Sequence, residues 1–172
     1  MRCLVFDYGG NLRSVAKAFG AEITKDPDAI RRADKIILPG QGAFDGCARA
    51  LPRDALNDFI KTGNPLLGIC VGMQLLGDES DEGAEKGLGW IPGRVERLNA
   101  PILPHIGWNE VIGMGHAYFS HSYVLRCDPK YVVAECDYGG LFPAIVKKDN
   151  ITGVQFHPEK SGRAWLGNAL LH

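Results

Sequence analysis

Four short apolar segments alternate with helical segments in the first 77 residues, and this alternation restricts the possible folds more than any other feature. The apolar segments are residues 2–7, 21–24, 35–38 and 65–69. Helical spacing is carried by residues 12–19, 27–33 and 44–62, the last divided by Pro52. Parallel strands need crossover connections, which are usually helices, so the pattern predicts a parallel sheet with right-handed crossovers.

Two of the predicted helices begin with residues that are typical of helix N-caps. Asn11 precedes the first helix, and Asp26 precedes the second. Pro27 follows at the first helical position, where a missing N–H costs nothing. We therefore expect Asn11 and Asp26 to cap these helices.

The second half of the chain has a different, β-type pattern. Strands are expected at residues 93–98, 107–111, 118–125, 131–135, 142–147 and 151–156, with a closing helix at 163–171. The acidic segment 78–89 is predicted to be a solvated loop. The 172 residues contain no linker or repeat. The expected fold is a single α/β domain over residues 1–172, with a mostly parallel central sheet flanked by helices and an antiparallel β extension.

Charge and cysteine usage exclude several classes of protein. A net charge of −1 and a pI near 6.5 give no electrostatic basis for binding nucleic acid or an anionic membrane. No apolar run approaches the length of a membrane-spanning helix, and no signal peptide opens the sequence. Cys3, Cys47, Cys70, Cys127 and Cys136 have no C-x-x-C spacing, which argues against a disulfide framework or a zinc site. We expect a cytoplasmic protein without a metal or cofactor.

Cys70 lies at a predicted strand-to-helix corner, with Gly68 and Gly72 two residues to either side. This spacing resembles the G-x-S-x-G nucleophile elbow, with sulfur in place of oxygen. Glycines allow close backbone approach at the corner, and the following helix N-terminus favours negative charge. The alternative is a structural cysteine that closes a buried strand, as most buried cysteines do.

Two residues near the C-terminus could activate this cysteine. In extended backbone His157 and Glu159 point to the same side, and Pro158 between them restricts φ. A thiol nucleophile needs a base, and the base needs an acidic group that orients it. Cys70, His157 and Glu159 are therefore the candidate catalytic residues. The alternative is a His-Pro-Glu sequence on a surface turn.

Acyl chemistry also requires donors for an oxyanion. The backbone N–H of Val71 is the usual first donor, and the glycine-rich loop that contains Gly40 and Gln41 could supply a second. Gln74 lies one helical turn after Cys70, where its amide could reach a substrate. The alternative for Gln74 is an exposed helix residue.

With these residues in place, the sequence resembles the class I glutamine amidotransferases. More narrowly, it is similar to the glutaminase subunits of imidazole glycerol phosphate synthase. The matching segments run in the family's order: Asp7-Tyr8-Gly9, Leu38-Pro39-Gly40, Gly68-Ile69-Cys70-Val71-Gly72-Met73-Gln74, Pro104-His105-Ile106-Gly107-Trp108-Asn109, His121-Ser122-Tyr123 and Gly153-Val154-Gln155-Phe156-His157-Pro158-Glu159-Lys160-Ser161.

The resemblance implies the class I amidotransferase fold and hydrolysis of glutamine to glutamate and ammonia. Cys70 would attack the carboxamide carbon, His157 would transfer protons, and Glu159 would orient His157. Gln74 and Glu82 would hold the amino-acid end of the substrate, with Glu82 offering a carboxylate to its ammonium group. Its α-carboxylate would be bound by backbone at Ser122 and Tyr123.

The resemblance also implies a partner, a (β/α)₈-barrel cyclase that receives the ammonia and forms a heterodimer with this chain in histidine biosynthesis. The positions that match partner-facing residues are Trp108, Asn109, Tyr118 and Lys160. The sequence departs from the family at Gln41, where valine is usual, and in short connections after residues 97 and 110.

Three other functions remain open at the level of sequence. The chain could be the glutaminase of another synthase, such as one in guanylate or anthranilate synthesis. It could also be a noncatalytic binding subunit that kept the scaffold. A redox-sensing thiol on a related fold is the third alternative.

Overall fold

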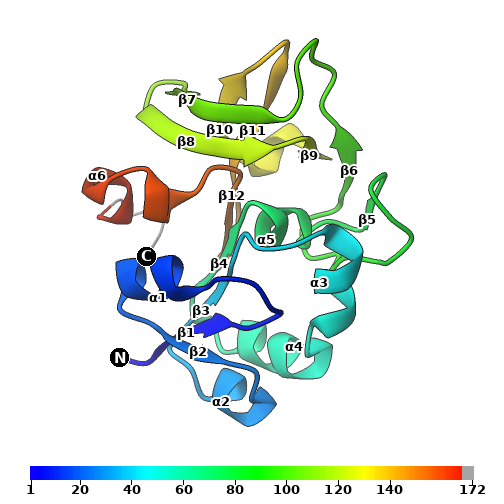
Figure 1. Cartoon of the computed structure of the whole chain (residues 1–172). Coiled ribbons are helices and arrows are strands. Elements are labelled where there is room, and N and C mark those ends of the chain that lie inside the picture. Colours follow the sequence, from blue (N-terminus) through cyan, green and yellow to red (C-terminus); the bar gives the residue numbers. More distant parts are fainter. Residues whose placement is uncertain (168–172) are drawn as a thin grey trace.

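The computed structural model describes residues 1–167, and its first half has the predicted alternation of strands and helices (Figure 1). The strands are β1 (Cys3–Phe6), β2 (Glu22–Thr24), β3 (Lys35–Leu38) and β4 (Leu66–Ile69). The helices between them are α1 (Arg13–Phe19), α2 (Pro27–Arg31), α3 (Phe44–Ala50) and α4 (Arg53–Lys61). Pro52 separates α3 from α4, as predicted, and Asp26 caps α2 by accepting from the Asp28 N–H.

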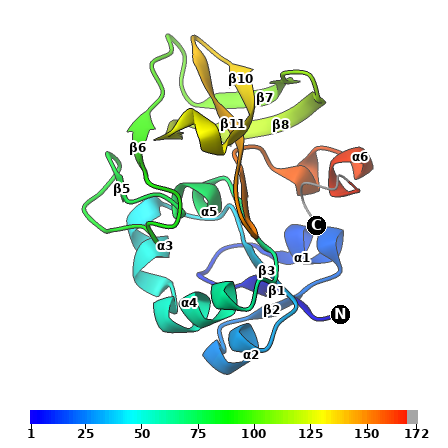
Figure 2. The same cartoon turned by 180° about the vertical axis from the view of Figure 1, so that it is seen from behind.

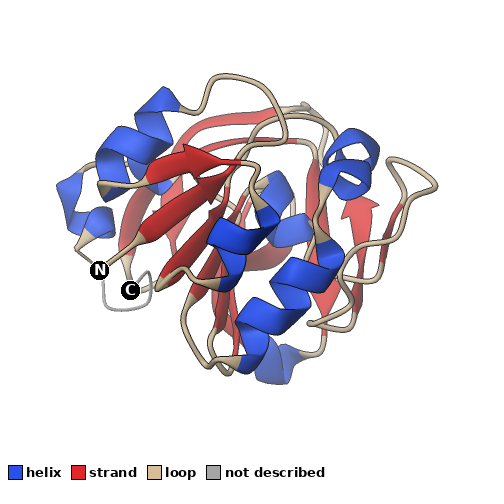
Figure 3. Ribbon diagram, turned by 90° about the horizontal axis from the view of Figure 1, so that it is seen from below, coloured by secondary structure: helices blue, strands red, loops and turns tan. Residues whose placement is uncertain are grey.

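A seven-stranded sheet forms the centre of the molecule. Its order is β10-β11-β12-β4-β3-β1-β2, in which β12 (Ile151–Val154) is parallel to β4. At the other side of β12, β11 (Leu141–Lys148) and β10 (Val132–Asp137) add antiparallel strands. Helices lie on both sides of the sheet (Figure 3). Because β3, β4 and β12 are parallel neighbours, the segments that follow them emerge at one edge.

The remaining strands form two small sheets above the parallel part (Figures 1 and 2). One unit pairs β5 (Glu79–Ser80), β6 (Gly93–Arg97) and β9 (Tyr123–Cys127), with β5 parallel to β6. The other is the hairpin of β7 (His105–Val111) and β8 (Gly115–His121). Short helical segments are α5 (Val71–Gln74), α6 (Arg163–Leu166) and 3₁₀ turns at Pro129–Tyr131 and Pro158–Lys160. The end of the predicted closing helix, beyond residue 167, lies outside the described residues.

Alternation along the central strands creates a core on each face of the sheet. Leu4 and Ile36 pack with buried side chains of α2, α3 and α4. Val5 and Ile37 point to the other face and pack with α1, the β7–β8 hairpin and α6. Strands covered on both faces appear as continuous apolar runs, which explains the pattern in the sequence.

No helix within residues 1–167 has the length and hydrophobicity needed to cross a membrane.

Three local predictions are wrong. Leu12, rather than Asn11, occupies the N-cap position of α1, and Asn11 instead accepts from the Arg13 N–H. The segment 78–89 contains β5, because Asp78 donates its backbone N–H to the Gly93 carbonyl and brings the segment alongside β6. The strand predicted at 118–125 is two strands that pair with different partners and separate at Ser122.

The closest backbone approach around α5 gives a stability prediction. A Cβ added at Gly72 would lie 2.1 Å from the Leu38 carbonyl oxygen, whereas one added at Gly46 in α3 would meet nothing within 4 Å. We expect Gly72→Ala to lower the free energy of unfolding by about 2 kcal/mol or more, because α5 and β3 must separate. Gly46→Ala should instead raise it by up to about 1 kcal/mol through helix propensity. Denaturant unfolding measures both, and equal stability of the two variants would contradict the prediction.

Candidate active site

Cys70 occupies the corner between β4 and α5 with a backbone conformation that is rare for a residue with a side chain. Its φ is +53° and its ψ is −110°. Its N–H donates to the Val154 carbonyl at 2.8 Å, which ties the corner to the end of β12. Gly68 and Gly72 permit this geometry, since a Cβ at Gly68 would lie 2.5 Å from the Gly72 oxygen. The structure therefore contains a nucleophile-elbow corner at the position that the glycine spacing predicts.

His157 and Glu159 follow β12 and lie at the same edge of the sheet as Cys70, which follows its parallel neighbour β4. His157 Nδ1 is 2.7 Å from Glu159 Oε1, and both side chains are about 5% exposed or less. Gly40, at the end of β3, lies between the nucleophile and the base: an added Cβ would be 2.7 Å from His157 Cε1 and 2.8 Å from Cys70 Cβ. The ends of β4 and β12 thus bring the three candidate catalytic residues together, next to Gly40 after β3.

The contacts of His157 with Cys70 and Glu159 favour the charged form of its ring. Burial alone would lower the pKa of His157, but hydrogen bonds of the ring to Cys70 and Glu159 outweigh it and raise the pKa from 6.5 to about 9. These contacts therefore favour an imidazolium beside the sulfur, with Glu159 on its other side. Such a ring can donate a proton to a leaving group, which is the acid step of acyl transfer.

A cavity of about 230 Å³ opens beside Cys70. Five of the seven predicted substrate-binding residues line it together with Cys70, Gly42, Ser120 and His121: Val71, Gln74, Glu82, Ser122 and Tyr123. Gln74 is buried, not exposed, and its Nε2 donates to the Tyr123 carbonyl at 3.0 Å and to Gln155 Oε1 at 3.4 Å. Burial raises the pKa of Glu82, although a hydrogen bond from the Phe44 N–H opposes it.

The other two predicted substrate-binding residues, Gly40 and Gln41, lie outside this cavity. They line a neighbouring hollow with Asn11, Glu159 and Lys160. The Gln41 carbonyl accepts from Cys47 Sγ at 3.1 Å, which fixes the direction of that peptide. Val71 is the first residue of α5, so its N–H has no partner within the helix and remains a candidate oxyanion donor.

The sequence prediction missed two groups that contact the sulfur. Gln155 is fully buried, and its Nε2 lies 3.6 Å from Cys70 Sγ. The Ser120 carbonyl lies 3.7 Å from the same atom. Gln155 stands two positions before His157, so the alternation that links His157 to Glu159 could also have indicated it. No sequence pattern marks Ser120, because its contact uses backbone only.

Three of the four predicted partner-facing residues form one cluster. Trp108 is 59% exposed and packs edge-on against Tyr118, with 6.3 Å between ring centroids. Lys160 Nζ lies 5.9 Å from the centre of the Tyr118 ring. The Tyr118 carbonyl accepts from the His157 N–H at 2.9 Å, so the cluster is hydrogen bonded directly to the backbone of His157. Asn109 differs: its amide points away from Trp108, toward His105 and the Asp137 carbonyl.

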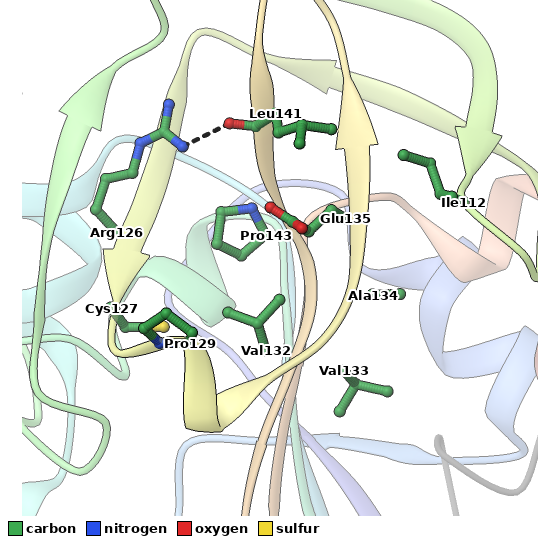
Figure 4. A pocket seen from close by; sticks show the side chains of 10 residues that line it. All are labelled: Ile112, Arg126, Cys127, Pro129, Val132, Val133, Ala134, Glu135, Leu141 and Pro143. Carbon is green, nitrogen blue, oxygen red and sulfur yellow. Dashed lines mark hydrogen bonds between the residues drawn. The ribbon is translucent and has the colours of Figure 1, made fainter.

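A larger hollow, about 490 Å³, lies elsewhere, against β9, β10 and β11 (Figure 4). Arg126 crosses one side of it and donates to the Leu141 carbonyl at 2.7 Å. None of the three candidate catalytic residues lines it.

Within residues 1–167 no group of three His, Cys, Asp or Glu side chains could hold a metal ion, and all five cysteines are free thiols.

Comparison with known proteins confirms the resemblance inferred from the sequence. The family model for class I glutamine amidotransferases matches residues 7–170. The chain therefore belongs to the class I glutamine amidotransferase family.

Its curated relatives are more specific than the family. The chain is 44% identical over 174 residues to the imidazole glycerol phosphate synthase subunit HisH of Exiguobacterium sibiricum, covering 94% of this chain and 89% of that protein. To the protein of the same name from Halobacterium salinarum it is 46% identical over 192 residues, covering 95% and 88%.

Solved structures confirm the predicted fold. A glutamine amidotransferase crystal structure superposes with a TM-score of 0.76 at 22% identity, covering 92% of this chain and 91% of that one. A chain in the structure of PurLQS from Thermotoga maritima gives 0.66 at 18% identity, covering 99% and 93%. At these identities the likeness concerns the fold alone.

The protonation of His157 is directly testable. Glu159→Gln removes the carboxylate charge, so we expect the pKa of His157 to fall well below 9, because burial is then opposed by fewer favourable contacts. Glu110→Gln, an exposed residue without contact to His157, should leave it unchanged. NMR titration of the imidazole signals measures both.

Since the folded pKa lies above the ordinary value, His157 stabilises the fold fully below about pH 6.5, and this contribution is lost as the pH rises through 9.

Proposed function

We propose that this chain is a glutaminase that hydrolyses L-glutamine to glutamate and ammonia and passes the ammonia to a cyclase. The observation that carries the proposal is that Cys70 and His157 both approach Gly40, where an added Cβ would lie within 2.8 Å of each, with Glu159 2.7 Å from the imidazole. Nucleophile, base and orienting acid are then arranged as acyl transfer from an amide requires.

The chemistry follows from this arrangement. Cys70 Sγ attacks the carboxamide carbon, and the oxyanion is stabilised by backbone N–H groups, of which Val71 supplies one. The His157 imidazolium gives its proton to the leaving nitrogen, so ammonia departs and a glutamyl thioester remains. His157 then takes a proton from water, whose oxygen attacks the thioester and releases glutamate. Glu159 holds the ring in the orientation that both transfers need.

The cavity beside Cys70 fits the amino-acid end of glutamine. Both N–H bonds of the Gln74 amide are directed at protein acceptors, which leaves its oxygen for the substrate ammonium group. Glu82 in the same cavity offers a carboxylate to that ammonium. The backbone at Ser122 and Tyr123 lies across the cavity, and we propose that it receives the α-carboxylate.

The partner would be a (β/α)₈-barrel cyclase that uses the ammonia to form imidazole glycerol phosphate. The support is the similarity to HisH proteins, which are named as subunits of imidazole glycerol phosphate synthase. Ammonia protonates in water, so delivery to a docked acceptor preserves it as a nucleophile. Trp108, Tyr118 and Lys160 are the proposed docking residues, since exposed aromatic side chains are typical interface anchors. Five free thiols fit a reducing compartment, and we propose the cytoplasm.

Removal of the nucleophile tests the reaction. We expect Cys70→Ala to reduce ammonia release from glutamine by at least about 10³-fold in the presence of the cyclase and its ligand. Cys127→Ala, remote from the site, should retain wild-type activity. The assay measures glutamate and ammonia together. Release at the wild-type rate from Cys70→Ala would refute the mechanism, and no release from the wild-type chain would refute the function.

The docking surface can be tested separately from the chemistry. Trp108→Ala removes an exposed aromatic anchor, so the dissociation constant for the cyclase should rise about tenfold or more. Ile23→Ala removes an exposed apolar side chain on β2, the edge strand of the central sheet opposite to β10, and should leave affinity for the cyclase unchanged. Calorimetry of each variant with the cyclase gives the constants. Equal effects of the two substitutions would place the interface elsewhere.

A further inference from the structure

Two buried histidines lie beside the candidate glutamine cavity and take no part in the chemistry proposed above. His105 begins β7 and His121 ends β8, and they face each other as the last pair of the hairpin register. His105 Nδ1 is 2.9 Å from His121 Nε2, and the side chains are 3% and 6% exposed. Buried polar rings destabilise a core unless their nitrogens are hydrogen bonded, so the pair needs a physical explanation.

The surrounding contacts permit one arrangement of protons. The Tyr123 carbonyl, which can only accept, lies 3.0 Å from His121 Nδ1, so that nitrogen carries the hydrogen. His121 Nε2 must then accept, and His105 Nδ1 donates to it. His105 Nε2 accepts from Asn109 Nδ2 at 3.2 Å. The Asn109 amide is oriented because its oxygen accepts from the Glu110 N–H at 2.8 Å. Each ring is therefore neutral and has a defined tautomer.

Burial reinforces the neutral state of both rings. It lowers the pKa of His105 from 6.5 to about 4. It also lowers the pKa of His121 to about 3, where the hydrogen bond to the Tyr123 carbonyl opposes the effect and the charges of His105 and His157 add to it. The chain of hydrogen bonds therefore keeps its direction throughout the physiological range.

The chain ends at a carbonyl of the cavity wall. Tyr123 O accepts from His121 on one side and from Gln74 Nε2 on the other, each at 3.0 Å. Gln74 also donates to Gln155, whose amide contacts Cys70 Sγ. A continuous path of hydrogen bonds thus connects β7, the cavity wall and the nucleophile. It fixes the Tyr123 peptide between two side chains that are themselves immobilised.

We infer that His105 and His121 are positioning residues for glutamine: they hold the Tyr123 carbonyl and, through it, the Ser122–Tyr123 backbone that binds the substrate's carboxylate. The inference rests on the function proposed above. Asn109 at the outer end of the path is adjacent to Trp108 in β7. A shift of β7 when the cyclase docks would therefore reach the substrate-binding backbone through the histidine pair.

The decisive variant is His105→Phe. Phenylalanine keeps the ring that stacks on Tyr138 and Phe119, at centroid distances of 4.0 Å and 4.8 Å, and removes both nitrogens. In the complex with the cyclase we expect KM for glutamine to rise about tenfold and kcat to change less than about threefold, because the triad is untouched. His105→Gln restores a donor and an acceptor, so KM should return to within about threefold of wild type.

Phe142→Leu is the matched control for packing. Phe142 lies against the same two rings, at 5.9 Å from His105 and 5.1 Å from His121, and its side chain cannot hydrogen bond. It should lower Tm without the rise in KM. An unchanged KM in His105→Phe, or an equal rise in Phe142→Leu, would overturn the inference. A wild-type complex that releases no ammonia would instead refute the proposed function.

A measurement on the unmodified chain covers the case in which His105→Phe does not fold. Nitrogen-15 NMR of the wild-type complex should show His121 as the Nδ1–H tautomer at pH 6 to 8. A His121 ring protonated at Nε2, or charged in this range, would be incompatible with the path and would overturn the inference.

Discussion

Parallel pairing between β4 and β12 brings together two segments that are distant in the chain. The register sets Val154 opposite Ile69, and the Cys70 N–H continues the ladder to the Val154 carbonyl. The positions of Cys70, His157 and Glu159 relative to one another depend on this pairing. A shift of β12 by one residue would reverse the side on which His157 projects and would remove it from the sulfur. The antiparallel strands β11 and β10, added beyond β12, keep it away from the edge of the sheet and so protect its register.

The sequence was sufficient to predict the fold class and to bring Cys70, His157 and Glu159, the candidate catalytic residues, to one edge of the sheet. Strands buried on both faces appear in the sequence as continuous apolar runs, so they can be recognised there. Parallel neighbours end at the same edge of the sheet. The glycines around Cys70 indicated a corner because few other residues tolerate backbone contact as close as that at Gly72. The spacing of His157 and Glu159 required only the two-residue period of extended backbone. These rules depend only on neighbouring residues in the sequence, so distant contacts do not change what they predict.

The remaining features depend on distant contacts that no local rule contains. The phase of β7 decides whether Asn109 or Trp108 faces solvent, and that phase is set by what covers the hairpin. The direction of Gln41 depends on the thiol of Cys47 in the next helix. The pairing of β5 with β6 requires Asp78 to meet Gly93. The histidine pair could not be inferred, because each member is merely a residue near a strand end until the hairpin register places them together.

The position of Gly40 has a consequence for how such a site can change. A side chain there would collide with both Cys70 and His157, so the close approach of these two residues depends on Gly40 having none. Any side chain at this position would have to displace Cys70, His157 or the loop itself. The loop and the three candidate catalytic residues must therefore evolve together, and a graft of Cys70, His157 and Glu159 without this loop would reproduce the residues but not their arrangement.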